Sequence, residues 1–406
     1  MARIVKKFGG TSVADIEKIR NVARRVADAR ADGHQVAVIV SAMGDETDKL
    51  VDLARQAARE PDQREYDNVV AAGEQVSAGL LAMVLQNMGV SARSWLGWQL
   101  PIETDGVHGS ARIQGISTDR LEQSLDRGEV AVIAGFQGIG PENRVTTMGR
   151  GGSDTTAVAV AAVLKADRCD IYTDVEGVFT SDPRIVAKAR KLDKITYEEM
   201  LEMASLGAKV LQTRSVELAM KHRVPVRVLS SFSDGQGTMV VDEDEIVEQR
   251  EVSGIAYSID EAKITLMKVA DRPGVAATIF GPLSDANINV DMIVQNVSED
   301  GTATDLTFTV SRGDLDRAIL VLDQSRDKIG YSEIDADRDV VKISVVGVGM
   351  RSHAGIAQSM FAALAEKAIN IKVISTSEIK ISVLIASEYT ELALRALHTA
   401  YGLDVD

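Results

Sequence analysis

The sequence of 406 residues contains a single cysteine, Cys169, and few aromatic side chains. One cysteine excludes an intramolecular disulfide and a thiolate metal cluster, and buried packing is its expected role. Because aromatic residues make up only 4% of the chain, the cores must be built mainly from Ala, Val, Ile, Leu and the 13 Met. Long hydrophobic runs are also missing: the longest, residues 157–164, spans eight residues, far short of the roughly 20 that a transmembrane helix needs.

Positive charge is scarce as well. The chain has 45 Lys and Arg against 60 Asp and Glu, which gives a net charge of -15. This balance argues against nucleic-acid binding, because a phosphate backbone needs a cationic partner surface. Small phosphate compounds are still possible ligands, since a locally positive pocket can lie inside an acidic shell. The charged residues 1–7 do not resemble a signal peptide, so we expect a cytoplasmic protein with no membrane partner.

Up to about residue 232, strand-like apolar runs alternate with amphipathic stretches of helix length. The predicted strands are residues 36–40, 130–134, 170–173 and 226–229. The predicted helices are residues 15–32, 48–59, 69–88 and 153–166. This alternation predicts an α/β domain with a mainly parallel sheet covered by helices on both faces. Ligands of such sheets bind at the carboxyl ends of the strands, so the chemistry is expected in the loops there.

The stretch of residues 233–251 is predicted to be a solvated linker. It opens with the turn-rich residues 233–237 and continues into acidic side chains at Asp242, Glu243, Asp244, Glu245, Glu248 and Glu251. The front domain is therefore expected to comprise residues 1–232.

The back of the chain contains an internal repeat. Gly274, in the turn at residues 271–276, is matched 81 residues later by Gly355 in the turn at residues 352–357. At the same offset Phe280 matches Phe361, Leu283 matches Leu364, and Ile288-Asn289 matches Ile369-Asn370. Each unit has the pattern of a ferredoxin-like βαββαβ module. The predicted units are residues 252–335 and 336–406, and their open sheet edges favour pairing with another copy.

The first of three loops suited to chemistry is Lys7-Phe8-Gly9-Gly10-Thr11-Ser12, between the first strand and the first helix. Paired glycines let the backbone approach a phosphate, whose oxygens accept N–H bonds at the positive end of a helix. Lys7 adds a point charge suited to a phosphoryl group in transfer. The alternative is a tight turn followed by a helix, with Lys7 on the surface.

The second loop, Gly149-Arg150-Gly151-Gly152-Ser153-Asp154, also precedes a predicted helix. Arg150 is suited to a bidentate contact with a carboxylate. Asp154 is suited to orienting a lysine. The alternative is a glycine turn in which Ser153 or Asp154 caps the helix.

The third loop, residues 173–184, combines acidic and hydroxyl side chains with Arg184. Such a set suits a nucleotide, with carboxylates available for Mg²⁺, but an Asp-Pro turn with exposed acids explains it as well. Ser41 follows the predicted strand 36–40, and Glu74 lies on the predicted helix 69–88. Taken alone, a single helical glutamate is expected to be exposed and without a role.

Other chemistries find no support in the sequence. It lacks a P-loop, a dinucleotide fingerprint and a Gly-x-Ser-x-Gly elbow. The five histidines show no ligand spacing, so no metal site built from protein side chains is expected.

Taken in order, the three loops resemble those of the aspartate kinases. The match extends through residues 41–44, Gly73-Glu74 and Gly207-Ala208-Lys209-Val210. The repeat resembles the paired ACT domains that those enzymes carry, including residues 271–274 and 375–378. The resemblance covers essentially the whole chain. No single motif is specific, whereas the ordered set is.

The resemblance implies an amino-acid-kinase three-layer sandwich followed by two ACT domains. It implies ATP- and Mg²⁺-dependent phosphorylation of the β-carboxylate of L-aspartate, the entry step to lysine, threonine and methionine. Lys7 would steady the transferring phosphoryl group, and Asp154 would orient Lys7. Implied substrate residues are Ser41, Thr47, Glu74 for the ammonium group, Arg150 for a carboxylate, Gly151, Gly152 and Ser153. Implied ATP residues are Lys7, Phe8, Gly9, Gly10, Thr173, Asp174, Phe179, Arg184 and Lys209.

The physical chemistry agrees with this reaction. A carboxylate nucleophile is already ionised at neutral pH, so no general base is required and the lack of a candidate His or Cys is expected. Two rivals stay open: a kinase of another amino acid or of a carbamate-like acid, and an inactive kinase fold whose ACT repeat only senses amino acids.

For the repeat, the resemblance implies feedback inhibition by lysine, threonine or both. The effector is expected near Asp271, Gly274, Gln295 and Asn296, or near Ser377 and Glu378. The alternative is that the repeat only dimerises the enzyme. A homo-oligomer formed through ACT domains is expected, as a dimer or higher, with or without a separately made subunit consisting of ACT domains alone.

Overall fold

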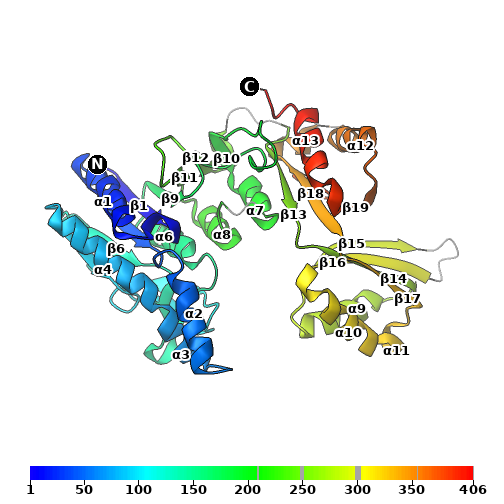
Figure 1. Ribbon diagram of the computed structural model, residues 1–406, viewed down its shortest axis with the longest axis horizontal. Coiled ribbons are helices and arrows are strands. Elements are labelled where there is room, and N and C mark those ends of the chain that lie inside the picture. Colours follow the sequence, from blue (N-terminus) through cyan, green and yellow to red (C-terminus); the bar gives the residue numbers. More distant parts are fainter. Residues whose placement is uncertain (208–209, 247–250, 298–302, 354, 406) are drawn as a thin grey trace. The chain divides into compact units, whose positions relative to one another are not determined.

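The computed structural model describes residues 1–207, 210–246, 251–297, 303–353 and 355–405. Over these residues the chain forms two compact units (Figure 1). The first comprises residues 1–178, 191–205 and 210–246, and the second comprises residues 179–190, 206–207 and the described residues from 251 onward. The segment 179–190 thus belongs to the second unit although its neighbours in sequence on both sides belong to the first.

The first unit is built on an eight-stranded sheet in the order β10-β12-β11-β9-β1-β2-β6-β3. Its strands are β1 (Arg3–Phe8), β2 (Gln35–Val40), β3 (Ala92–Trp95), β6 (Val130–Ala134), β9 (Arg168–Thr173), β10 (Lys194–Thr196), β11 (Val226–Ser230) and β12 (Thr238–Val241). All neighbours pair in parallel except β11 with β12. The expected α/β class with a mainly parallel sheet is confirmed, and β1 lies near the centre of the sheet.

Helices cover both faces of this sheet because its central strands are apolar on both sides. All six residues of β2 are buried. Val36, Val38 and Val40 pack in the core that contains α1 (Ile16–Ala31) and α4 (Ala72–Asn87), while α6 (Gly152–Val163) contacts β1, β2 and β9. The other helices are α2 (Glu46–Ala57), α3 (Gln63–Val70), α5 (Asp119–Asp126), α7 (Tyr197–Ser205) and α8 (Thr213–His222). Cys169 is buried on β9, as expected of a packing residue.

A smaller four-stranded sheet in the order β5-β4-β7-β8 completes the first unit. Its strands are β4 (Ile102–Thr104), β5 (Ile113–Ile116), β7 (Gln137–Ile139) and β8 (Val145–Thr147). The sequence did not predict this sheet, whose strands have only three or four residues each.

Two predictions for the first unit need correction. Residues 238–241, placed in the acidic linker, form β12, whose Val240 and Val241 are buried in the main sheet. The predicted helix 69–88 is two helices, because α3 ends at Val70 and α4 begins at Ala72. By length and composition the stretch Gln63–Asn87 could cross a membrane, but half of its most apolar window is buried in the protein, as in a core helix.

The second unit contains the repeat. The first copy has a sheet in the order β15-β16-β14-β17 and consists of β14 (Ala262–Ala270), α9 (Val275–Asp285), β15 (Val290–Val297), β16 (Ala303–Val310), α10 (Leu315–Gln324), α11 (Arg326–Ile329) and β17 (Glu333–Asp337). The second copy consists of β18 (Val340–Val346), α12 (Ile356–Glu366), β19 (Ile371–Thr376), β20 (Lys380–Ala386) and α13 (Thr390–Ala400). The first copy has the predicted βαββαβ order.

The second copy takes its remaining strand from upstream. Strand β13 (Gly254–Ser258) pairs antiparallel with β18, which gives the sheet order β13-β18-β20-β19. The first copy is therefore inserted into the second, and the predicted boundary between residues 335 and 336 does not separate them. An offset between repeats shows how the copies match, but not which copy a flanking strand joins.

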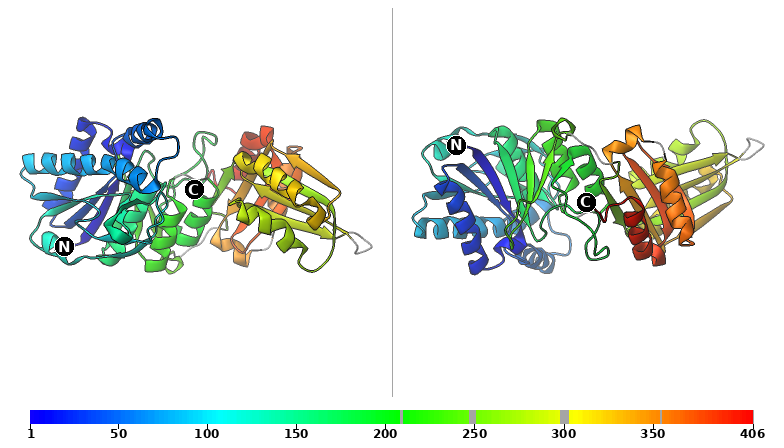
Figure 2. Two further views of the ribbon diagram at one scale, coloured as in Figure 1. Left: turned by 90° about the horizontal axis from the view of Figure 1, so that it is seen from below. Right: turned by 90° about the horizontal axis from the view of Figure 1, so that it is seen from above.

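The two repeat sheets pack against each other, with their helices on the outer sides (Figures 1 and 2). Met292 of the first copy lies in one buried apolar cluster with Val373 and Leu384 of the second. Beside this apolar contact, the buried Lys342 ammonium lies 2.7 Å from Glu261 and 2.6 Å from Asp291.

Candidate active site

The loops at the carboxyl ends of β1, β2, β6 and β9 meet in the first unit. Gly9 N–H donates to the Tyr172 carbonyl (3.4 Å), and Gly44 N–H donates to the Gly10 carbonyl (3.0 Å). A Cβ at Gly10 would lie 3.0 Å from the Ala42 carbonyl oxygen, so the close approach of these two loops depends on a missing side chain. The Phe8 ring, directly before the glycines, stacks on the Tyr172 ring.

Lys7 and Asp154 form a nearly buried ion pair. Lys7 Nζ lies 2.6 Å from Asp154 Oδ1, although that oxygen is not aligned as a hydrogen-bond acceptor. The two side chains are 11% and 10% exposed. Lys7 extends from β1, the strand flanked by β9 and β2, and Asp154 lies in the first turn of α6, where the helix dipole favours a negative charge. The alternative of an exposed surface lysine is therefore wrong.

Two glycines with positive φ shape the loop before α6. Gly149 has φ 72° and Gly151 has φ 74°. A Cβ at Gly151 would lie 2.1 Å from the Gln212 side chain. Arg150, between them, is exposed and has no hydrogen-bond or ion-pair partner within the described part of the chain. Gly151 itself is the N-cap of α6, without a side-chain cap, so the capping role considered for Ser153 or Asp154 is wrong.

Glu74 is a buried carboxylate whose hydrogen bonds are incomplete. It lies in the first turn of α4 and is only 3% exposed, so the expectation of an idle surface residue is wrong. Oε1 accepts the Ala42 N–H (3.1 Å), whereas Oε2 has no hydrogen-bond partner among the described residues. Burial raises the pKa of Glu74 to about 7. A Cβ at Gly73 would lie 2.7 Å from Ala42 Cβ, which shows how closely α4 approaches the loop after β2.

The other predicted substrate residues lie on the same loops. Ser41, half-buried, donates its N–H to the Phe8 carbonyl (3.1 Å) directly after β2. Thr47 is in the first turn of α2. Gly152 and Ser153 are buried at the start of α6.

The predicted nucleotide residues are divided. Thr173 is the last residue of β9 and Asp174 follows it. Thr173 Oγ1 donates to Asp174 Oδ1 (3.1 Å), and the Thr173 carbonyl accepts the Ser231 N–H (2.8 Å). Phe179 and Arg184 belong to the second unit, where Arg184 pairs with Asp182 (2.7 Å). Lys209 lies outside the described residues. Over the described residues, no group of three or more His, Cys, Asp or Glu is placed to hold a metal ion.

The predicted effector residues lie in the repeat. Gly274 and Gly355 are the N-caps of α9 and α12 with φ 87° and 101°, so the repeated glycine has one conformation in both copies. Gln295 and Asn296 are exposed on β15, an edge strand. Ser377 N–H donates to the Lys380 carbonyl (2.8 Å) in the turn between β19 and β20, where Glu378 lies 3.6 Å from Arg351.

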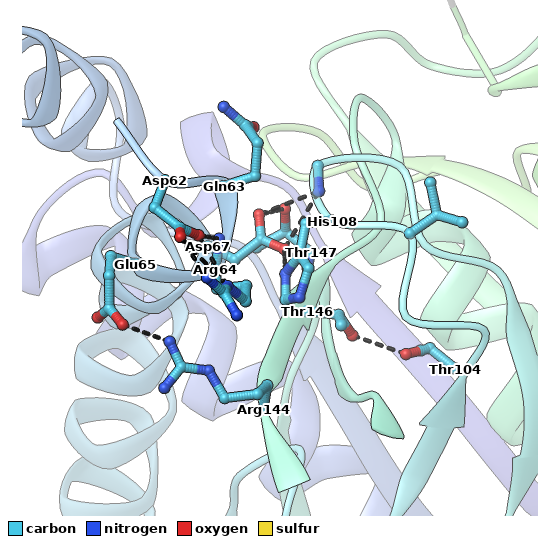
Figure 3. A network of polar contacts seen from close by, with 12 residues as sticks. Asp62, Gln63, Arg64, Glu65, Asp67, Thr104, His108, Arg144, Thr146 and Thr147 are labelled. Atoms are coloured by element: carbon cyan, nitrogen blue, oxygen red, sulfur yellow. Dashed lines mark hydrogen bonds and ion pairs between the residues drawn. The ribbon is translucent and has the colours of Figure 1, made fainter. Parts of the chain in front are cut away.

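Sequence reasoning missed one polar centre close to these loops, at Asp67 on α3 (Figure 3). This fully buried carboxylate accepts hydrogen bonds from His108, Gly109 and Thr147. These donors come from a loop and a strand end 41 to 80 residues away in sequence. No local pattern signals such a centre.

Comparison with known proteins assigns the chain to a family. The model of the amino acid kinase family matches residues 2–230, and ACT domain models match residues 263–326 and 343–401. Aspartate kinase Ask_LysC of Stutzerimonas stutzeri (strain A1501) is 56% identical over 405 residues, which cover 100% of this chain and 98% of that relative. The chain belongs to the aspartate kinases of the amino acid kinase family.

Two solved structures extend the match to the fold. E. coli aspartokinase III in complex with aspartate and ADP (R-state) is 26% identical with a TM-score of 0.82, covering 98% of this chain and 99% of that chain. The same protein in complex with lysine and aspartate (T-state) has a TM-score of 0.78 at 26% identity, covering 98% of both chains. The expected family and fold class, with two ACT domains, are confirmed.

Proposed function

We propose that the protein transfers the γ-phosphoryl group of ATP to the β-carboxylate of L-aspartate, giving 4-phospho-L-aspartate and ADP as the first step of lysine, threonine and methionine biosynthesis. The observation that carries the proposal is the nearly buried Lys7–Asp154 pair at the end of β1, beside two glycine loops. The ligands of the R-state structure of E. coli aspartokinase III, aspartate and ADP, support it.

The reaction needs positioning and charge neutralisation rather than a base. One β-carboxylate oxygen attacks the γ-phosphorus while the bond from that phosphorus to the β,γ-bridging oxygen breaks, and the electron pair leaves with ADP. Lys7 stabilises the negative charge on the phosphoryl oxygens during transfer. Asp154 keeps the Lys7 ammonium directed toward that position from the first turn of α6.

Aspartate is held at its ammonium and carboxylate groups. Glu74 Oε2, buried and without a protein partner among the described residues, is suited to accept the substrate ammonium. Arg150, exposed and unpaired in the described structure, is suited to a bidentate contact with a carboxylate. Ser41, Thr47 and the backbone of residues 151–153 complete this subsite.

ATP is held on the side of β1 that faces β9. Phe8, Gly9 and Gly10 line the phosphates, while Thr173 and Asp174 contact the nucleotide at the end of β9. Phe179, Arg184 and Lys209 are proposed as further nucleotide residues on the resemblance to aspartate kinases alone. Asp154 and Asp174 are the candidates to hold Mg²⁺, which would keep several waters and need only one or two protein carboxylates. When bound, Mg²⁺ would neutralise phosphate charge.

The ACT domains inhibit the kinase when lysine, threonine or both bind near Asp271, Gly274, Gln295 and Asn296 or near Ser377 and Glu378. The segment 179–190 supports this regulation, because it contains the later part of the proposed nucleotide loop at residues 173–184 and yet packs within the second unit. Thr180 Oγ1 shares a hydrogen bond with the buried His398 of α13 (2.9 Å), and the Thr180 carbonyl accepts the Ile255 N–H of β13 (2.8 Å). We place the enzyme in the cytoplasm as a homo-oligomer formed through its ACT domains, with or without a separately made ACT-only subunit.

A hydroxamate assay with ATP, Mg²⁺ and a set of amino acids tests the proposal. Acyl-phosphate formation with aspartate alone is the expected result. Formation with a different acid would identify a related amino acid kinase instead. No product with any acid, together with binding of lysine or threonine, would leave only an amino-acid sensor.

A further inference from the structure

The buried carboxylate of Asp67 takes no part in the proposed reaction. Asp67 is 0% exposed and lies on α3. Glu74 follows seven residues later on α4, and Arg150 follows three residues after Thr147, a partner of Asp67. The centre thus connects the helix pair α3–α4 with the loop that carries Arg150.

Five hydrogen bonds at Asp67 join three separate segments (Figure 3). From the loop between β4 and β5, His108 Nδ1 lies 2.7 Å away, and Gly109 N–H donates to both carboxylate oxygens at 3.1 Å. From the end of β8, Thr147 donates its N–H (3.0 Å) and its hydroxyl (2.6 Å). A buried anion with this many donors fixes the positions of the segments that supply them.

These contacts reach the substrate loop through the backbone. The Thr147 carbonyl accepts the Ala111 N–H (2.9 Å), and the Met148 carbonyl accepts from Arg214 (3.1 Å). A Cβ at Gly149 would lie 3.0 Å from the carbonyl oxygen of Gly109, the residue held by Asp67. The first residues of the loop are therefore set directly against groups that Asp67 positions.

The same helix pair carries Glu74. The Ala71 carbonyl, at the junction between α3 and α4, accepts a hydrogen bond from Gln137 of β7 (2.9 Å). Glu65 of α3 also pairs with Arg144, next to β8 (Figure 3). Movement of α3 relative to β8 would thus change the separation between Glu74 and Arg150.

We propose that Asp67 is a positioning residue for aspartate: by clamping α3 to the end of β8 it sets the separation between the ammonium site at Glu74 and the carboxylate site at Arg150. This inference rests on the proposed function. Misplacement of a binding group by about 1 Å lowers reactivity up to about a hundredfold in enzymes. Loss of the clamp should therefore weaken the binding of aspartate, because the clamp sets the distance between the sites for its two ends. The binding of ATP should be unchanged, because ATP is bound through other loops.

Asp67→Asn is the main variant, because it keeps the volume but replaces an acceptor oxygen with a donor. We expect the KM for aspartate to rise about tenfold or more, with the KM for ATP within about twofold of wild type. An unchanged KM for aspartate overturns the proposal whatever happens to stability, as does an equal rise in both KM values. If Asp67→Asn does not fold, the same criteria apply to Thr147→Val, which removes one donor at constant shape and should raise the KM for aspartate about threefold to tenfold.

Two controls complete the experiment. Thr147→Ser retains the hydroxyl and should restore a KM near the wild-type value. Thr104→Val removes a buried hydroxyl that pairs with Thr146 (2.8 Å) and not with Asp67, so it should lower stability without changing the KM for aspartate. A rise in KM for Thr104→Val equal to that of Thr147→Val would overturn the proposal. Absence of aspartate phosphorylation by the wild-type enzyme would instead refute the proposed function, so the two failures are distinct.

Discussion

Asp67 and Glu74 are buried carboxylates on consecutive helices, yet their surroundings differ. Asp67 accepts five hydrogen bonds from three partner residues, whereas Glu74 accepts one from Ala42 and leaves Oε2 without a partner among the described residues. A buried charge costs free energy unless donors compensate it. The carboxylate of Asp67, which has its full set of donors, therefore stabilises the fold. The carboxylate of Glu74, which does not, is available to a cationic ligand.

The Lys7–Asp154 pair is a third case, a buried carboxylate compensated by a lysine with a proposed role in phosphoryl transfer. We expect Lys7→Ala to lower kcat by about a thousandfold or more while the protein stays folded, because the charge that stabilises the transferring group is lost. Steady-state kinetics with circular dichroism measures both. The matched control is Lys6→Met: the neighbouring ammonium contacts Asp170 (3.5 Å) and the Tyr172 hydroxyl (3.1 Å) instead, so its loss should lower stability and retain turnover. Near-normal turnover in Lys7→Ala would contradict the assigned role.

Glu74→Gln tests whether the Glu74 carboxylate binds the substrate ammonium. The amide cannot pair with the substrate ammonium as an anion, so we expect the KM for aspartate to rise about a hundredfold with a small change in the KM for ATP. Glu60→Gln, an exposed exchange between α2 and α3, serves as the control and should leave both KM values unchanged. A KM for aspartate within twofold of wild type in Glu74→Gln would remove Glu74 from the substrate site.

Replacing the two carboxylates should also change the free energy of unfolding in opposite directions. At pH 8 the folded protein holds Glu74 ionised against a raised pKa of about 7, so Glu74→Gln should increase the free energy of unfolding by about 1–3 kcal/mol. That advantage should vanish near pH 5, where Glu74 is protonated in the fold. Asp67→Asn should lower the free energy of unfolding by about 2–4 kcal/mol at both pH values, since it leaves buried donors unpaired. Urea unfolding at pH 5 and pH 8 measures both effects; equal signs for the two variants at pH 8 would refute the distinction.

The smallest effect is expected in the segment 179–190. Thr180→Val removes the hydroxyl that accepts the Arg190 N–H (3.0 Å) and bonds to His398 (2.9 Å). We expect about a threefold loss of sensitivity to lysine or threonine, because the segment is then held less firmly within the second unit. Inhibition curves for Thr180→Val and for Thr180→Ser, which retains the hydroxyl, provide the measurement. Identical curves for wild type and Thr180→Val would show that this contact does not carry regulation.

Sequence reasoning was most successful where chain order carries the information. The loops with Lys7 and Asp154 could be expected to meet because each follows a strand of a parallel sheet or precedes the helix packed on it. The burial of Glu74 could not be foreseen from periodicity, since α4 is apolar over most of its surface. A single glutamate in the first turn of such a helix can be either buried or exposed.

Long-range contacts explain what sequence reasoning missed. Asp67 is compensated by residues 41 to 80 positions away, two of them through backbone N–H groups that any residue would supply. Strand β12 lies just before an acidic run that resembles a linker, and β13 joins the second repeat sheet across the whole inserted first copy. The division of the predicted ATP residues between the two units depends on tertiary packing as well.

Proton release on aspartate binding tests most directly whether Glu74 Oε2 binds the substrate ammonium. With a pKa of about 7, Glu74 is about half protonated at pH 7, and an ammonium group at Oε2 requires the ionised form. Calorimetric titration of the wild-type enzyme with aspartate in two buffers of different ionisation enthalpy should therefore show release of about half a proton at pH 7, falling toward zero at pH 8.5. Glu74→Gln should show no such release. Equal proton release by the wild-type enzyme and Glu74→Gln would contradict the account.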